Sequence, residues 1–369
     1  MNKLTLLATD ASGNKTGELD GFAEFTAIPR FNAIGKWLLK MDYTQDQAAL
    51  LDRYAGIALE LDGDIVFSGP VAGIHREGIG DKDLITISGT DDMGLLAGRL
   101  ALPVPGGPPY TSAEFDVRTG YAETVIKEYV AYNCGPLARA SRMIPGLTIP
   151  VTQQRGSAVT GRARFDKLVG FLVNLAAIGG IGLRCVNQVF DCYFPADLSA
   201  PVILSKALGT LGDFSYEFGL PDVNFIFVGG SGTGTSRAIT ELGDSQSILD
   251  WRIQEAFLDA SKTSVVAELM DAGTAELGKK AGASKFSVSS IAMPGREPLV
   301  DYGLGDRIKA VIDGVSLTMI AAEFEISLTK DGAQKVKPTF SAGAVPVGLL
   351  RNFDTAVRTR QDVDLLQRK

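Results

Sequence analysis

Short runs of β-branched and aromatic residues, separated by glycine-containing turns, dominate the first hundred residues and return after about residue 200. Such runs predict strands, because branched and aromatic side chains pack well on a pleated surface. Within residues 57–67 the pair Asp62-Gly63 predicts a hairpin, since tight turns of this kind need positive φ. Further strand-like stretches occupy residues 3–9, 22–43, 72–78, 83–90, 214–220, 223–230, 236–244, 284–293, 306–332 and 333–343.

Apolar positions at helical spacing mark the segment between these two regions. One set predicts a helix near residues 122–130, and a second set predicts another that stops at Gly179-Gly180. A hairpin is expected over 182–194, and the four prolines and two glycines of 102–112 predict a domain boundary. The helical positions are Ala122, Val125, Ile126, Tyr129 and Val130 in the first set, and Phe165, Leu168, Val169, Leu172, Leu175 and Ala176 in the second.

Three more helices are predicted outside this segment. A short one follows Thr90, with Asp91 or Asp92 as its N-cap, and another lies near residues 265–280. After Ala342 apolar residues again recur at helical spacing, which predicts a C-terminal helix. Its stripe is a candidate partner interface or self-association surface, and packing on its own domain is an equal alternative. The candidate interface residues are Leu349, Leu350, Phe353 and Val357.

Two distant pieces of the chain resemble each other. Residues 57–78 and 308–329 each predict a strand, an Asp-Gly turn, a second strand and a third long strand, followed by another turn and a closing strand. Such self-similarity predicts two related antiparallel barrels separated by an α/β insertion. Unrelated β-meanders also look alike, so the similarity alone leaves both interpretations open. The expected division is a β-barrel over 1–100, an α/β domain over 101–197, a second barrel over 198–341 with a helical insertion near 244–284, and a C-terminal linker and helix over 342–369.

Composition excludes several classes of protein. Of 369 residues, 45% are apolar and 21% charged, which is typical of globular domains rather than disordered chains. A formal charge of −7 argues against a nucleic-acid-binding surface, which would need a basic face. The start reaches a charge at Asp10 and the apolar stretch Leu168–Leu183 is broken by Asn174 and four glycines. We therefore expect no signal peptide and no stable membrane insertion, and synthesis in the cytoplasm.

The residues that usually carry catalysis are sparse. The three cysteines, Cys134, Cys185 and Cys192, form no CxxC pair, so we expect buried thiols rather than zinc ligands. The single histidine, His75, has no nucleophile motif nearby and is expected to be an exposed strand residue. The loop after the strand-like run at 225–229 is rich in glycine but lacks the lysine of a phosphate-binding loop, so a hairpin tip is predicted. No cofactor is expected.

Carboxylates are harder to exclude, because an acid–base pair leaves no local signature. The acidic residues cluster at predicted turns and helix caps, where they stabilise backbone geometry. A carboxylate-based glycan or peptidoglycan hydrolase stays an alternative, and so does a carbohydrate-binding adhesin with Tyr110 and Trp251 as exposed aromatics. The acidic residues considered are Asp62, Asp81, Asp83, Asp91, Asp92, Asp313 and Asp331.

Taken together, seven stretches in order across residues 20–341 resemble the Siphovirus ReqiPepy-type minor tail proteins, which occur in phages and prophages of actinobacteria. The glycine-rich stretch FIFVGGSGTGTSR is one of them. The stretches are RFNAIGKWLLKM (30–41), FSGPVAGIHRE (67–77), ISGTDDMGLLAGRLALP (87–103), FDVRTGYAETVIKEYVAYNCGP (115–136), VTGRARFDKLVGFLVNLAAIGGIGLR (159–184), FIFVGGSGTGTSR (225–237) and DYGLGDRIKAVIDG (301–314).

The resemblance implies a fold class of α+β, mainly β, with two tube-type antiparallel β-barrel domains, an inserted α/β domain and a C-terminal helix. It implies a baseplate hub at the virion tail tip, in which three chains supply six barrels around a channel for DNA ejection. The expected partners are two further copies, the distal tail protein, the tape-measure protein and tail fibre or spike proteins. The hydrolase module of larger relatives is not expected, because the sequence ends about thirty residues after the second predicted barrel, so no enzyme activity is predicted.

Overall fold

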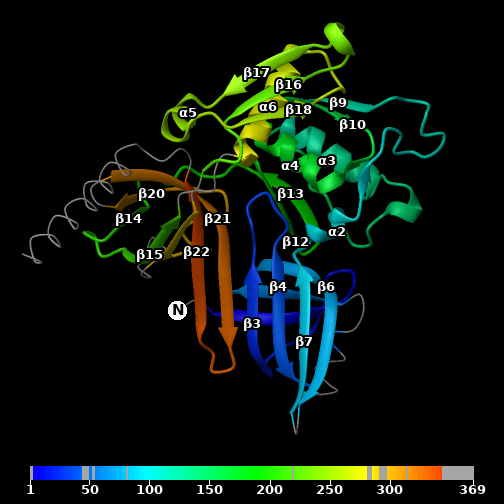
Figure 1. The fold of residues 1–369 in the computed structure, drawn as a ribbon. Helices are drawn as coiled ribbons and strands as arrows, with labels where there is room; N and C mark the ends of the chain where they lie inside the picture. Colours follow the sequence, from blue (N-terminus) through cyan, green and yellow to red (C-terminus); the bar gives the residue numbers. More distant parts are fainter. Residues whose placement is uncertain are drawn as a thin grey trace, which may run out of the picture. The chain divides into compact units, whose positions relative to one another are not determined.

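The computed structural model describes residues 3–43, 50–51, 55–79, 82–217, 220–280, 285–290, 297–312 and 315–342. The chain divides into two compact units. Unit 1 comprises Met1–Pro195 with Glu323–Lys337, and unit 2 comprises Ala196–Ala322 with Pro338–Lys369. Both units are built mainly from strands and contain few helices (Figure 1), as the sequence predicts.

One large sheet dominates unit 1, and its strands pair in the order β3-β4-β7-β6-β5-β1-β2. The predicted hairpin is confirmed, because β5 and β6 pair antiparallel around Asp62-Gly63, whose φ angles are 50° and 102°. The strands are β1 (Leu4–Thr9), β2 (Lys15–Glu18), β3 (Phe22–Ile28), β4 (Lys36–Asp42), β5 (Gly56–Leu61), β6 (Asp64–Ile79) and β7 (Lys82–Thr90).

Alternation along these strands explains why they form a sheet with a buried face. In β4 the side chains of Trp37, Leu39 and Met41 are buried, while Lys36 before them and Lys40 between Leu39 and Met41 are exposed. This period of two places every second residue in the core. A late part of the chain extends the same sheet, because β21 (Val315–Thr329) pairs antiparallel with β3 over four residues.

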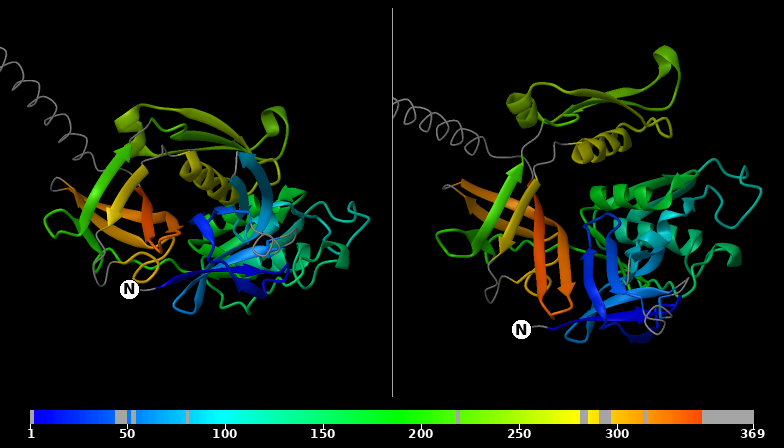
Figure 2. Two further views of the ribbon diagram at one scale, coloured as in Figure 1. Left: turned by 90° about the horizontal axis from the view of Figure 1, so that it is seen from below. Right: turned by 60° about the horizontal axis from the view of Figure 1, so that its bottom comes forward.

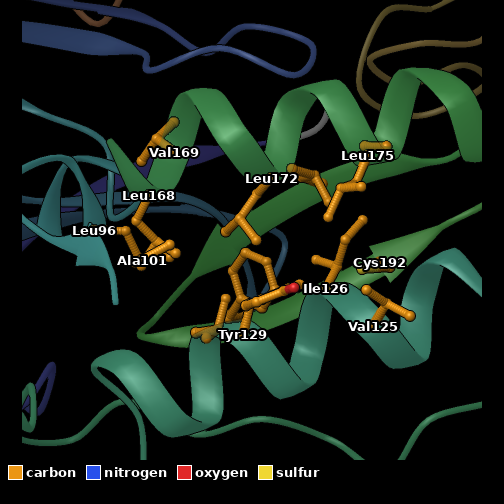
Figure 3. Packing of buried hydrophobic residues seen from close by; sticks show 14 of the residues in the cluster. Leu96, Ala101, Val125, Ile126, Tyr129, Leu168, Val169, Leu172, Leu175 and Cys192 are labelled. Carbon is orange, nitrogen blue, oxygen red and sulfur yellow. The ribbon is translucent and has the colours of Figure 1, made fainter. Parts of the chain in front are cut away.

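The rest of unit 1 is a small α/β assembly around two helices, α3 and α4, both of which the sequence predicts. Figure 3 shows Tyr129 and Ile126 of α3 facing Leu172 and Leu175 of α4, and all four are buried. Gly180 ends α4 in the left-handed conformation, with φ of 67°, as the predicted stop requires. The elements are α2 (Gly94–Ala97), β8 (Leu100–Ala101), β9 (Asp116–Tyr121), α3 (Ala122–Asn133), η1 (Ala140–Arg142), β10 (Ala158–Ala163), β11 (Asp166–Lys167), α4 (Leu168–Gly179), β12 (Gly182–Val186) and β13 (Val189–Tyr193).

Two local predictions in this region are wrong. Phe165 is not part of the buried stripe of α4: it precedes the helix, has φ of 60° and is 48% exposed. Helix α2 forms where expected, but its N-cap is Met93, with no side-chain cap. Asp91 and Asp92 therefore do not cap α2, and their carboxylates are used elsewhere.

The strands of the unit 2 sheet pair in the order β15-β19-β22-β21-β20-β14, and the part of β21 and β22 within Glu323–Lys337 belongs to unit 1. In this sheet β14 pairs parallel with β20, whereas β20 pairs antiparallel with β21 and β15 antiparallel with β19. The remaining strands are β14 (Ile203–Ser205), β15 (Leu211–Glu217), β19 (Lys285–Ser290), β20 (Arg307–Ile312) and β22 (Gln334–Ala342).

The two sheets repeat one topology, which confirms that the internal similarity is structural. The meander β5-β6-β7 has strands of 6, 16 and 9 residues, and the meander β20-β21-β22 has strands of 6, 15 and 9. In each sheet the last strand of the meander pairs with the next strand of the order, β4 or β19, and that strand pairs with β3 or β15. The pairings of β4 with β3 and β7, of β19 with β15 and β22, and of β20 with β21 are all antiparallel. Strand β14 differs, because it pairs parallel with β20.

An insertion separates β15 from β19, whereas their counterparts β3 and β4 follow each other directly. It folds as a three-stranded sheet, β17-β16-β18, with α6 along one face (Figure 2). Helix α5 was not predicted, although Asp244 caps it by accepting the N–H groups of Gln246 and Ser247. The elements are β16 (Phe225–Gly229), η2 (Gly234–Ser236), β17 (Ile239–Gly243), α5 (Ser245–Trp251), β18 (Glu255–Asp259) and α6 (Val266–Lys280).

Neither sheet closes on itself among the described strands: β2 pairs only with β1, and β15 only with β19. The two closed barrels of the expected fold are therefore not confirmed, and the boundaries near residues 100, 197 and 341 stay a prediction. The candidate interface residues Leu349, Leu350, Phe353 and Val357 lie outside the described residues. Among the described helices, none combines the length and apolar character needed to span a membrane.

Candidate functional site

A cavity of about 740 Å³ opens in unit 1 beside the large sheet. Most of its wall is small and apolar, with several glycine and alanine residues of β5 and β6. The polar part of the wall comes from the β1–β2 turn, from β6, from the segment between β7 and α2, and from the β12–β13 turn. These polar lining residues are Asp10, Ser68, Asp92, Asn187 and Gln188.

Asp92 links the sheet to the α/β assembly at the edge of this cavity. Its carboxylate accepts hydrogen bonds from Ser68 Oγ at 2.6 Å and from the backbone N–H of Gln188 at 2.9 Å. Ser68 Oγ in turn accepts the N–H of Asn187 at 2.6 Å. The buried carboxylate of Asp92 and the buried hydroxyl of Ser68 thus hold the β12–β13 turn to β6. Because water is excluded from this site, these hydrogen bonds are electrostatically stronger than they would be in solvent.

Asp91 makes a second link, to the loop after β3. Its Oδ2 accepts the N–H of Gly35 at 2.7 Å, while its Oδ1 is buried and has no hydrogen-bond partner among the described residues. In the same loop the side chain of Asn32 donates to Ile181 O and accepts from Leu183 N, so it pairs with the start of β12. Asp91 and Asp92 therefore serve as structural connectors in this structure rather than as helix caps.

Burial dominates the electrostatics of both groups. It raises the pKa of Asp91 to about 6, against the lowering effect of the Gly35 hydrogen bond, and the neighbouring Asp92 raises it further. Burial also raises the pKa of Asp92, although Ser68 and the N–H of Gln188 lower it in part. Ionised Asp91 thus carries a desolvation cost that the lowering effects of the backbone N–H groups of Gly35, Gly94 and Met93 do not offset.

Replacing Asp91 with asparagine is expected to remove a pH-dependent loss of stability. Because the folded-state pKa lies above the unfolded value, Asp91 favours folding below about pH 4, and this contribution is lost as the pH rises through about 6. Two pKa units correspond to roughly 3 kcal/mol. The free energy of unfolding, measured by denaturant titration from pH 4 to 7, should fall less with rising pH in Asp91→Asn than in the wild type. Equal slopes for the two proteins would contradict the assignment.

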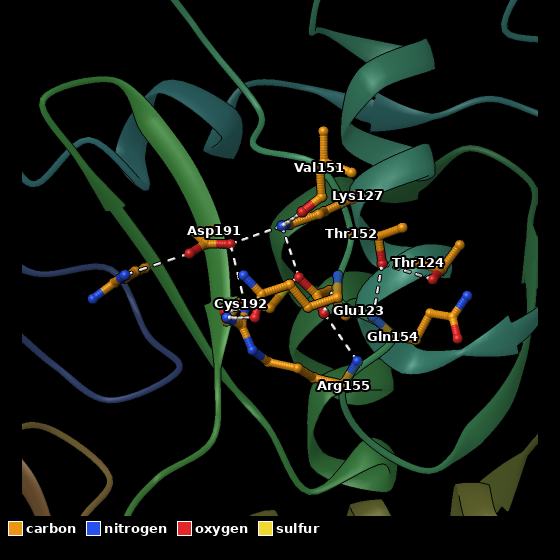
Figure 4. A network of polar contacts seen from close by, with 11 residues as sticks. Glu123, Thr124, Lys127, Val151, Thr152, Gln154, Arg155, Asp191 and Cys192 are labelled. Atoms are coloured by element: carbon orange, nitrogen blue, oxygen red, sulfur yellow. Dashed lines mark hydrogen bonds and ion pairs between the residues drawn. The ribbon is translucent and has the colours of Figure 1, made fainter.

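A second buried polar cluster joins α3, the segment before β10 and β13 (Figure 4). Lys127 Nζ lies 2.7 Å from Glu123 Oε1 and 2.7 Å from Asp191 Oδ1. Arg155 Nη1 lies 3.1 Å from Glu123 Oε1 and donates to the carbonyl of Cys192 at 2.6 Å. Glu123 is fully buried, and its other oxygen accepts the N–H groups of Gln153 and Arg155.

The charges in this cluster balance. Burial alone raises the pKa of Glu123, but the ammonium of Lys127 and the two backbone N–H groups outweigh it and lower the pKa overall. For Asp191 burial likewise raises the pKa, and the bond from Lys127 turns the net shift downward. Burial lowers the pKa of Lys127, and Asp191 and Glu123 together raise it above its usual value. All three groups are charged, and Lys127 forms ion pairs with both carboxylates. This arrangement suits a structural connection between α3 and β13.

Sequence analysis missed this cluster. The signal available was local: Glu123 and Lys127 are four residues apart, and in the predicted helix both flank its apolar face. Their partners Asp191 and Arg155 come from distant segments, so spacing along the chain carries no information about them.

The glycine-rich loop is a hairpin tip, as predicted. It joins β16 to β17, which pair antiparallel. Arg237 fills the loop: its guanidinium donates to Gly230 O at 2.9 Å and to Gly229 O at 3.0 Å, and pairs with Asp259 at 2.6 Å. An arginine that binds the loop carbonyls stabilises the turn from within.

The other predicted residues lie apart from these clusters. His75 is an exposed strand residue, as expected, with Nε2 3.7 Å from Glu77. The three cysteines are free and buried, and burial raises the pKa of each thiol, to about 11 in Cys134 and about 12 in Cys192. No group of three or more His, Cys, Asp or Glu side chains that could hold a metal ion occurs in the described part of the chain.

The similarity to solved structures covers nearly the whole chain. The 43 kDa tail protein of prophage MuSo2 from Shewanella oneidensis has a TM-score of 0.62 and 14% identity, covering 93% of this chain and 98% of its own. A tail protein from Neisseria meningitidis MC58 has a TM-score of 0.59 and 12% identity, covering 92% and 96%. Prophage tail protein gp18 from Listeria monocytogenes EGD-e has a TM-score of 0.56 and 12% identity, covering 96% and 99%. At these identities the comparison establishes the fold.

Sequence comparison supplies the family. No curated protein matches the chain. A family profile described as Siphovirus ReqiPepy6 Gp37-like protein matches residues 5–340, which confirms the resemblance inferred from the seven stretches. With the match running through both sheets and the insertion, the chain belongs to the Siphovirus ReqiPepy6 Gp37-like protein family.

Proposed function

We propose that this protein is a structural component of the phage tail, a homotrimeric hub at the tail tip or baseplate. The observation that carries the proposal is the fold similarity to three tail proteins, two of them from prophages, over more than nine-tenths of each chain. Membership of a siphovirus family over residues 5–340 points the same way.

The repeated sheet topology supports symmetry matching as the mechanism. Each chain carries two equivalent meanders, β5-β6-β7 and β20-β21-β22, so three chains present six. A trimer of this protein would therefore continue a six-fold tail tube while presenting three-fold symmetry beyond it. Strands with a single described partner, such as β2 and β15, have a free edge that a neighbouring copy would cover.

The hub would enclose a channel through which DNA passes during ejection. A formal charge of −7 suits this role, because an acidic surface does not retain the phosphate backbone. Its neighbours would be the distal tail protein, the tape-measure protein, and a fibre or spike protein.

We propose further that the protein works without catalysis. The buried charges of unit 1 are engaged in ion pairs and backbone hydrogen bonds, which suits a rigid scaffold. Incubation of the purified protein with actinobacterial cell walls tests this. We expect no released sugar or peptide, and release that depends on a specific carboxylate would favour a hydrolase instead.

The trimer is tested by the mass of the native protein in solution. Light scattering after gel filtration should give three times the 39.1 kDa of the chain. Images of the tail tip averaged without imposed symmetry should show a three-fold ring. A monomer at all accessible concentrations, together with tail tips that lack three-fold symmetry, would contradict the proposal.

A further inference from the structure

The insertion between β15 and β19 presents a sheet with only one covered face. Helix α6 packs on one side, where Ile226, Val228 and Leu269 are buried. Side chains that alternate with these along the strands lie on the opposite face of the sheet. The first repeat has no such insertion, so the three-stranded sheet is not needed to complete the repeated fold.

The opposite side is an apolar platform formed by Phe225, Phe227, Ile239 and Phe257. Register pairs place Phe227 beside Phe257, and the rings of Phe225 and Phe227 meet edge-on at 5.2 Å. Phe257 remains 55% exposed and Ile239 60% exposed. Phe225 and Phe227 are half-buried beside them, so two exposed and two partly exposed apolar side chains share one sheet face, a pattern typical of a binding surface.

Two glycines leave room for aromatic rings of the platform to lie over the sheet surface. A Cβ atom at Gly243 would lie 2.7 Å from the ring of Phe225, and one at Gly229 would overlap the ring of Phe257. The rings therefore lie over the glycine positions instead of standing upright from the sheet. This arrangement exposes ring faces and edges to a partner.

Carboxylates surround the platform. Glu241 and Glu255 are exposed next to Phe227 and Phe225, and neither has an ion-pair partner among the described residues. Asp259 is paired with Arg237, whose guanidinium also lies 5.2 Å from the centre of the Phe257 ring. The platform thus selects an apolar partner segment flanked by basic residues.

The chain itself contains an apolar segment flanked by basic residues. Within 349–360, apolar residues at helical spacing alternate with Arg351, Arg358 and Arg360, against a single acidic residue, Asp354. This segment lies beyond Ala342, the last described residue. Its positive charge is complementary to the carboxylates beside the platform, and a helix laid on an apolar sheet face buries such a stripe.

We propose that residues 349–360 of a neighbouring copy bind the platform on β16, β17 and β18. Every copy then offers one platform and one C-terminal segment, so a closed ring satisfies all of them. This inference rests on the proposed multi-copy assembly, and it assigns the C-terminal segment to contacts between copies.

Site-specific cross-linking of the full-length protein tests the proposal. A photo-reactive phenylalanine analogue at position 257 should give a covalent species of twice the chain mass, with the cross-link mapping to residues 349–360. The same analogue at position 151, where Val151 is 87% exposed in unit 1, serves as the control and should give no such species. Cross-links confined to one chain, cross-links to another segment, or none at all would overturn the proposal.

Charge reversal gives a second, independent readout. The double change Glu241→Lys with Glu255→Lys should lower the yield of the cross-linked species by about tenfold. Adding Arg358→Glu and Arg360→Glu should restore much of it, and failure of this rescue would argue against the assigned pairing. Native mass is measured in parallel: a trimer without the cross-link overturns this inference alone, whereas a monomer at all accessible concentrations, with tail tips that lack three-fold symmetry, overturns the proposed function as well.

Discussion

Replacing Lys127 with methionine is expected to lower the free energy of unfolding by about 3–5 kcal/mol, the range for removing one partner of a buried ion pair. Methionine retains the apolar stem but removes the ammonium that lies 2.7 Å from both Glu123 and Asp191. Glu123 is fully buried, so it would stay in the interior with Arg155 as its one remaining ion-pair partner among the described residues. Denaturant titration at neutral pH measures the loss.

A matched control comes from the same carboxylate. Arg184 pairs with Asp191 at 3.4 Å, but its side chain is 58% exposed. Exposed ion pairs contribute about 0–1 kcal/mol, so Arg184→Ala should change stability by less than about 1 kcal/mol. Similar losses for the two variants would show that the cluster does not depend on the buried ammonium. The buried pair also predicts acid sensitivity, because the lowered pKa of Glu123 and of Asp191 means that their stabilisation is lost as the pH falls through those values.

Replacing Gly89 with alanine is expected to cost about 3 kcal/mol, the upper end for overpacking a core. Gly89 lies in β7 between β4 and β6, opposite Trp37 in the register. A Cβ atom there would overlap the carbonyl oxygen of Pro70 and the indole of Trp37, which is 2% exposed. Neither the backbone nor a buried ring has room to move.

Gly78, in the same pair of strands, is the control for backbone effects. A Cβ atom at Gly78 meets nothing within 4 Å, so Gly78→Ala should be neutral or stabilising by up to about 1 kcal/mol, through reduced freedom of the unfolded chain. Thermal unfolding of both variants would separate the two effects. A Gly89→Ala protein as stable as the wild type would show that β7 shifts to accommodate the methyl group.

Local patterns predicted much of the secondary structure. The buried positions of α3, the stop of α4 at Gly180, and the turn at Asp62-Gly63 were correct, because each depends on residues close together in the chain. Helix α6 and the hairpin at the glycine-rich loop were correct for the same reason. Local rules failed at Asp91 and Asp92, where capping was expected and the carboxylates instead bind Gly35 and Ser68.

The candidate site could not be predicted in the same way. Asp191 joins Lys127 only because β13 packs against α3, and no spacing rule connects residues brought together by folding. The platform could not be predicted from the sequence either. Phe225, Phe227 and Phe257 would be assigned to a core on hydrophobicity alone, and only the position of α6 shows which strand face is covered.

By itself, the sequence determined that the protein is mainly β, that it contains two similar meanders, and that it belongs to one phage family, because these depend on residue order and local pattern. Only the tertiary structure decided that the repeat extends to the pairing of β4 with β3 and of β19 with β15. Backbone hydrogen bonds and the packing of whole sheet faces determine which strands pair. Because these interactions involve many residues from distant segments, no single position of the sequence predicts them.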